Sequence, residues 1–106
     1  VDNIDIVKLD IEGHEDAFFK GAYSWLIRER PVIFVEINNW FYERKGTSTS
    51  AAFSESLPEK YSVALVKSSK KGIQLQVIGI EDLSELRNIE TCVMYPDEMR
   101  SWIFES

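Results

Sequence analysis

The hydrophobic pattern near the start of the chain predicts a strand, a helix and a second strand. Residues 4–11 (IDIVKLDI) form a nearly continuous apolar run rich in β-branched residues, which is typical of a buried strand in a mostly parallel sheet. Pro31 ends the helical pattern that follows, and residues 32–37 (VIFVEI) form a second apolar strand. Between Glu15 and about Arg28 the apolar positions fall on one helix face, at Phe18, Ala22, Trp25 and Leu26. Together these elements predict a βαβ unit with parallel strands and a right-handed crossover.

The rest of the chain is divided into shorter elements. Residues 38–49 are predicted as a polar loop that contains three consecutive aromatic residues, and residues 50–57 as a short helix. Further strands are predicted at 61–67, 73–78 and 91–95, with a weak helical turn at 81–86 and a short terminal helix at 96–104. We therefore expect an α/β fold with a mixed sheet, formed by one unit without repeats or an interdomain linker.

Composition and charge narrow the classes of function. The chain has 106 residues, of which 44% are hydrophobic, as in a small globular domain or part of a larger one. Its formal net charge of −6 disfavours nucleic acid and anionic membrane surfaces as partners. The single cysteine, Cys92, lies in an apolar stretch and is expected to be a buried thiol. The sequence carries no pattern of a signal peptide or membrane span, so a cytoplasmic location is expected.

Acidic side chains gather where the first predicted strand ends. The segment that leaves this strand contains the carboxylates Asp10, Glu12 and Glu15. Glu36 and Asn38 lie at the corresponding end of the second strand. Ligands of open α/β sheets bind at the carboxyl ends of the strands, and paired strands lie about 5 Å apart. Asp10 and Glu36 are therefore predicted to line one cleft.

Each of these charged residues also has a structural explanation. Lys8 shares a strand face with Asp10 and, in a buried strand, needs a partner, so it can equally form a structural ion pair with Asp10 or Glu36. Glu15 can equally act only by favouring a helix N-terminus. His14, the only histidine, is a candidate general base, a candidate metal ligand beside the neighbouring carboxylates, or simply a loop residue.

Three aromatic residues, Trp40, Phe41 and Tyr42, follow the second predicted strand. Aromatic side chains at this position can wall a substrate pocket, because ligand sites are lined mainly by apolar and aromatic groups. They can equally cap the edge of the hydrophobic core, and the sequence favours neither explanation over the other.

Several fixed positions resemble the FkbM methyltransferase family. The segment KLDIEGHE at residues 8–15 matches the K-x-D-x-E-G-x-E signature of that family. The later Gly21-Ala22 pair and the segment PVIFVEI at residues 31–37 match its G-A pair and its P-x-x-x-x-E strand, without a gap in the spacing. The short helix, the hairpin-like segment, the acidic-leucine turn and the final strand ending in Tyr95-Pro96 are similar as well. The resemblance thus covers most of the chain.

The resemblance implies a Rossmann-like fold that uses S-adenosylmethionine to methylate a hydroxyl oxygen, often on a sugar or natural product. It implies that residues 4–11 are the fourth strand of that fold and that the rest supplies strands five to seven, the last antiparallel. On this template we predict catalytic roles for Asp10, His14 and Glu36. We predict cofactor contacts from Asp10, Glu12 and Gly13, and substrate contacts from Glu15, Asn38 and Trp40. We assign no metal ligand, and the sequence leaves open whether a metal ion assists the reaction.

The glycine-rich loop with which such enzymes hold their cofactor is absent from this sequence. We therefore expect residues 1–106 to form one partial domain that lacks the cofactor-binding half and is inactive alone. The start of the chain, without Met and close to a strand, is in keeping with a fragment. The uncovered edge of residues 4–11 then predicts a homodimer through that edge, or a compensating partner. The alternatives are a non-catalytic α/β interaction module and a metal-dependent hydrolase that uses Asp10, Glu12 and His14.

Overall fold

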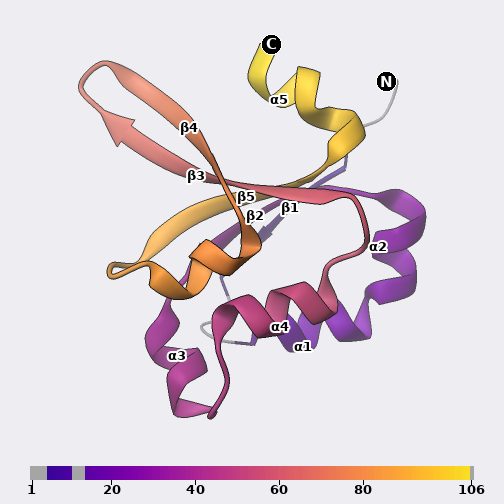
Figure 1. Cartoon of the computed structure of the whole chain (residues 1–106). Coiled ribbons are helices and arrows are strands. Elements are labelled where there is room, and N and C mark those ends of the chain that lie inside the picture. The colour runs from indigo at the N-terminus through magenta and orange to yellow at the C-terminus, as the bar shows by residue number, and fades with distance from the viewer. Residues whose placement is uncertain (1–4, 11–13, 106) are drawn as a thin grey trace.

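A computed structural model of the chain describes residues 5–10 and 14–105, and Figure 1 shows its single mixed sheet. The five strands are β1 (Ile6–Leu9), β2 (Val32–Ile37), β3 (Tyr61–Ser69), β4 (Gly72–Ile78) and β5 (Glu90–Pro96). They are arranged in the order β1-β2-β5-β3-β4. β1 and β2 are parallel, whereas β5 is antiparallel to both β2 and β3, and β4 is antiparallel to β3. The last strand is thus inserted between strands formed earlier in the chain.

Helices cover the two faces of the sheet unequally. The helical elements are α1 (Glu15–Gly21), α2 (Tyr23–Glu29), α3 (Asn39–Arg44), α4 (Thr49–Ser56), η1 (Ile80–Glu85), η2 (Asp97–Met99) and α5 (Arg100–Glu105). Figure 1 shows α1, α2, α4 and η1 on one side of the sheet and α5 on the other. Within residues 5–10 and 14–105, no helix is long and apolar enough to cross a bilayer.

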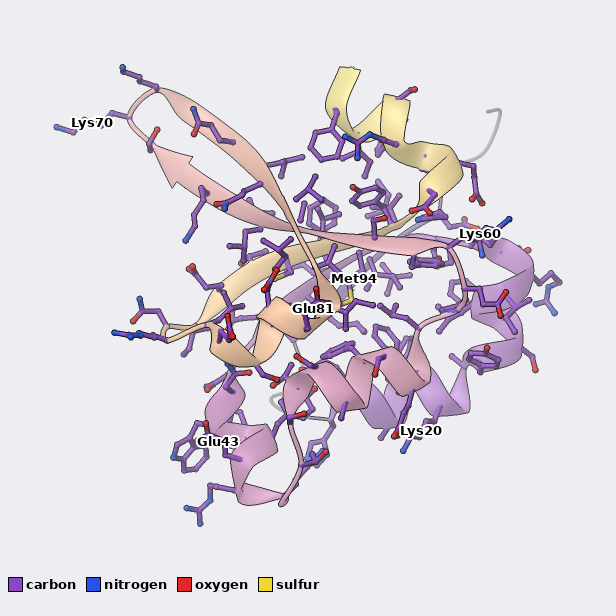
Figure 2. The ribbon with its side chains drawn as sticks, viewed as in Figure 1. Lys20, Glu43, Lys60, Lys70, Glu81 and Met94 are labelled. Atoms are coloured by element: carbon purple, nitrogen blue, oxygen red, sulfur yellow. The ribbon has the colours of Figure 1, made fainter. Side chains whose placement is uncertain are left out.

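The main hydrophobic core lies between the sheet and the larger helical layer. Alternate residues of β2 and β5 point into it, as the period of two in a strand requires, and Figure 2 shows Met94 between the sheet and α4. The helices contribute fully buried side chains, Phe19, Leu26, Tyr42, Phe53 and Leu83. A smaller cluster on the opposite face, under α5, contains Val32, Ala64, Val93, Tyr95 and Met99.

The expected α/β fold with a mixed sheet is confirmed, and the second strand spans the predicted residues 32–37. The helix predicted between Glu15 and Arg28 is interrupted at Ala22, although Ala22 still donates to the carbonyl of Phe18 and accepts from Leu26. The other predicted strands lie within two residues of the observed ones. The hairpin of β3 and β4 extends beyond the helical layers (Figure 1).

Two expectations about the elements were wrong. The first strand is not buried: β1 is an edge strand, and Ile6 keeps 55% of its surface exposed because helices cover little of this edge. Residues 38–49 are not a continuous loop, because α3 begins directly after Asn38. The Asn38 side chain accepts a hydrogen bond from the backbone N–H of Trp40 and so caps the helix.

Candidate functional site

The parallel pairing of β1 and β2 brings two predicted site residues together. Lys8 pairs with Phe34 and Leu9 with Val35, so the next positions along the two strands are Asp10 and Glu36. On the other side of β2, Glu36 pairs with Thr91 of β5. A hollow of about 130 Å³, the carboxylate hollow, is lined by Lys8, Leu9, Asp10, Phe34, Val35, Glu36 and Thr91. The predicted meeting of Asp10 and Glu36 in one hollow is therefore observed.

The charged side chains of the carboxylate hollow are open to solvent. Lys8, Asp10 and Glu36 are all exposed. Within the described part of the chain, none of the three forms an ion pair or a side-chain hydrogen bond. The structural ion pair considered for Lys8 is thus not formed with Asp10 or Glu36. Two carboxylates and one ammonium group lie around the hollow and can contact a ligand.

His14 does not join the carboxylate hollow. It is exposed and precedes α1, where its backbone carbonyl accepts a hydrogen bond from Phe18 at 3.1 Å. Its side chain does not cap the helix and does not line the hollow. The predicted cofactor residues Glu12 and Gly13 lie outside the described residues. Asp10 and Glu36 therefore form the part of the predicted catalytic group that the fold brings together.

Glu15, predicted as a substrate contact, lies inside the protein. It is 1% exposed, and its Oε1 accepts a hydrogen bond of 2.6 Å from the hydroxyl of Tyr42. A buried carboxylate needs such partners because its desolvation is costly. The contact ties the first residue of α1 to α3, so Glu15 connects two helices inside the fold.

The remaining predicted substrate residues line a second hollow. Asn38 and Trp40 lie with Asn39 and Glu43 of α3 on one side of a space of about 410 Å³, and residues 84–89 form the other side. We call this space the α3 hollow. Of the three consecutive aromatic residues, Trp40 is 54% exposed and lines this hollow, whereas Tyr42 is fully buried. Tyr42 thus belongs to the hydrophobic core, whereas Trp40 lines an open hollow.

The second wall of the α3 hollow could not be predicted from the sequence. Ser84, Glu85, Leu86, Arg87, Asn88 and Ile89 carry no recognisable motif, and they meet α3 only because the chain folds back. Asn39 connects α3 to the segment that leads into this wall. Its Nδ2 donates to the carbonyls of Leu83 and Leu86 at 3.0 and 2.8 Å.

Other chemical groups contribute little to a site. Cys92 is a fully buried thiol, as expected, and burial raises its pKa to about 12, so it is not a ready nucleophile. Within residues 5–10 and 14–105, no group of three histidine, cysteine or acidic side chains is arranged to hold a metal ion. Those residues therefore give the hydrolase alternative no support, although Glu12 lies outside them.

The sequence was also compared with known families and proteins. It matches the family model described as "Methyltransferase FkbM domain" over residues 1–105, nearly the whole chain. No curated protein sequence gives a significant match. The matched region includes both strands that carry the carboxylate hollow and both walls of the α3 hollow.

Proposed function

We propose, because this chain belongs to the FkbM methyltransferase domain family, that it forms the acceptor side of an O-methyl-transfer site. The acceptor is the hydroxyl group of a small molecule, such as a sugar or natural product. The observation that carries the proposal is the meeting of Asp10 and Glu36 at the carboxyl ends of two parallel strands. In open α/β sheets this edge is where ligands bind.

The carboxylate hollow suits the activation of a hydroxyl group. A neutral hydroxyl is a weak nucleophile, and a positioned carboxylate that takes its proton raises its reactivity. Asp10 and Glu36 lie on neighbouring strands, about 5 Å apart in backbone spacing, so one can accept the proton while the other holds the hydroxyl. The ammonium group of Lys8 on the same wall stabilises negative charge that develops on the acceptor oxygen.

The arrangement of the sheet supports the proposal that the chain corresponds to strands four to seven of a Rossmann-like methyltransferase fold. β1 and β2 would then be the fourth and fifth strands, and the last strand, β5, is antiparallel to both of its neighbours. The hairpin strand β4 would be an addition at the far edge of the sheet.

Family membership implies S-adenosylmethionine as the methyl donor in general, and the donor supplies a methyl group bound to a positively charged sulfur. The carboxylate hollow alone does not fit this molecule as a whole. The carboxylate hollow measures about 130 Å³, whereas sites for ligands of that size occupy roughly 300–1,000 Å³. We therefore assign to this chain the contacts to the acceptor, and we expect the 106 residues alone to bind the donor weakly and to be inactive.

Methyl transfer by the full-length gene product tests the proposal. The product is incubated with S-adenosylmethionine carrying a tritiated methyl group and with a panel of sugars, cyclitols and macrocyclic alcohols. We expect label on a hydroxyl oxygen, and a loss of at least about a hundredfold in kcat when Asp10→Asn or Glu36→Gln removes the base. Asp5→Asn, an exposed carboxylate at the other end of β1, is the matched control and should keep full activity. Label on nitrogen or carboxylate acceptors, or full activity in both hollow variants, would refute the proposal.

A further inference from the structure

The α3 hollow begins one strand pair beyond the residues that line the carboxylate hollow. Glu36 pairs with Thr91 at the carboxylate hollow, and the next pair along the strands is Ile37 with Glu90. Asn38 and Ile89, which follow that pair on either strand, already line the α3 hollow. Two residues of extended chain span about 7 Å. Glu36 shares its face of the sheet with Phe34, whereas Ile37 faces the main core, so an acceptor that occupies both hollows passes over the carboxyl end of β2.

The walls of the α3 hollow are held in place by their own hydrogen bonds. Asn39 uses both Nδ2 hydrogens on carbonyl groups of the opposite wall, at Leu83 and Leu86, and its Oδ1 accepts from the hydroxyl of Thr49. Ser84 donates from its hydroxyl to Ser50 at 2.7 Å, which fixes the start of the same wall against α4. Figure 1 shows α3 below the turn that joins η1 to β5. A site with fixed walls loses little conformational entropy when a ligand binds.

Other polar groups of the α3 hollow are not used by the fold. Glu43, Arg87 and Asn88 are exposed, and their side chains form no hydrogen bond or ion pair within the described part of the chain. Glu43 also lines a second hollow of about 230 Å³ on the side of Thr47 and Thr49, so it lies between two open spaces. Figure 2 shows Glu43 on α3. These groups offer both donors and acceptors to a ligand.

The exposed indole of Trp40 adds an apolar surface. Arg44 lies over one face of its ring at 4.6 Å, and Phe41 contacts its ring edge to face with the two ring centres 5.0 Å apart. The residue nevertheless keeps 54% of its surface exposed, and it lines the hollow. An aromatic ring held by its neighbours provides a rigid platform for the apolar side of a flat ligand.

We infer that the α3 hollow is a recognition subsite for a neutral, hydroxyl-bearing ring of the acceptor, an inference that rests on the proposed function. Trp40 contacts the C–H face of the ring, while Glu43, Arg87 and Asn88 bind its hydroxyl groups. The lining carries two carboxylates, Glu43 and Glu85, and one guanidinium group, so phosphorylated or polyanionic ligands are repelled. Its polar lining likewise excludes lipid chains, which require an apolar groove.

Ligand binding to the 106-residue chain, without any methyl donor, tests this inference. The probes are methyl β-glucopyranoside and myo-inositol, titrated into the ¹⁵N-labelled chain and followed by two-dimensional NMR. For molecules of this size we expect saturable binding with a Kd on the order of 1 mM. The shifts should include the indole N–H of Trp40 and the backbone of residues 84–89, and glucose 6-phosphate should bind at least about fivefold more weakly.

Matched variants make the assignment specific. Trp40→Ala and Arg87→Ala should each weaken binding at least about fivefold, because each removes one type of contact. Trp102→Ala is the control: Trp102 is also partly exposed, at 39%, but it belongs to α5 on the opposite face of the sheet. Each variant must keep the dispersed spectrum of the folded chain. Absence of saturable shifts, stronger binding of the phosphorylated probe, or unchanged binding in Trp40→Ala would overturn the inference.

The result of the ring-binding experiment can be distinguished from the result of the methyl-transfer experiment that tests the proposed function. Glu36→Gln should abolish methyl transfer yet leave ring binding unchanged, since Glu36 lies outside the α3 hollow. If ring binding fails while the gene product still methylates hydroxyl groups, the acceptor is recognised elsewhere. If ring binding holds while methyl transfer fails, the α3 hollow is a binding site and the proposed function is wrong.

Discussion

Arg30 shows how a single residue connects distant segments of this chain. It ends α2 in a left-handed conformation, with φ of 44°, which strains a residue other than glycine by roughly 1–2 kcal/mol. Its guanidinium donates to both carboxylate oxygens of Glu98, at 2.5 and 3.0 Å, and to the carbonyls of Glu59 and Lys60. It also lies over the ring of Tyr61 at 5.2 Å. These contacts hold the strained residue in place.

The pair of Arg30 and Glu98 predicts a dependence of stability on pH. The hydrogen bond from Arg30 lowers the pKa of Glu98 below its usual 4.5, so the pair stabilises the fold above that value and loses its effect as the pH falls through the lowered pKa. At pH 7 we expect Glu98→Gln to reduce the free energy of unfolding by about 0.5–1 kcal/mol, a small value because the carboxylate is half exposed. The difference from the wild type should shrink as the pH falls through this lowered pKa.

Urea denaturation at several pH values measures this difference, with tryptophan fluorescence as the signal. Glu55→Gln, an exposed carboxylate of α4, is the control and should behave like the wild type throughout. If the free energy of unfolding of Glu98→Gln stays below that of the wild type by the same amount from neutral to acid pH, the ion pair is not the cause of the difference.

At the scale of elements, the helices and strands that could be predicted are those that depend on the local pattern of apolar and polar residues. Both ends of β2 were predicted correctly, because Pro31 and Asn38 bound the apolar run and so fix its first and last residues. The meeting of Asp10 and Glu36 in one hollow followed from the parallel strands of one βαβ unit. The helix α3 was missed because its three aromatic residues do not repeat at helical spacing, although Asn38 was a visible N-cap.

Features that depend on distant contacts could not be predicted. Glu15 stands in a first helical turn, where acidic residues are usually exposed and favoured by the helix dipole. Its burial depends on Tyr42, which lies 27 positions later. The α3 hollow likewise requires residues 84–89 to return to Asn39, and no local pattern encodes that approach.

The bond between α1 and α3 predicts a large effect from a small change. Tyr42→Phe removes only the hydroxyl that donates to the buried carboxylate of Glu15 at 2.6 Å. Because this leaves a buried charge with one partner fewer, we expect the free energy of unfolding to fall by about 1.5–3 kcal/mol. Tyr23→Phe removes an equivalent hydroxyl from a residue that is 39% exposed and should change stability little. Equal effects of the two substitutions in urea denaturation would contradict a structural role for Glu15.

At the scale of the whole molecule, β1 leaves one side of the sheet open. The carbonyl of Asp5 accepts a hydrogen bond from the backbone N–H of Val32 at 2.9 Å. The backbone groups of every second residue of this strand, counted from Asp5, therefore point toward β2. The backbone groups of Ile6 and Lys8 therefore point away from the sheet, as in any parallel edge strand. The other edge strand, β4, begins after an exposed turn that carries Lys70 (Figure 2), and such charged edges discourage pairing.

The open edge predicts self-association of the 106-residue chain. Two copies can pair antiparallel through β1, which joins their sheets and satisfies the outward backbone groups of both. We expect a dimer in light scattering at concentrations on the order of 100 µM, an affinity typical of small interfaces. Ile6→Pro removes an outward N–H without breaking a bond to β2, so it should give a monomer that keeps its fold. Ile6→Ala keeps the N–H and should remain a dimer. A monomeric wild type, or a dimer that survives Ile6→Pro, would mean that β1 is not the interface.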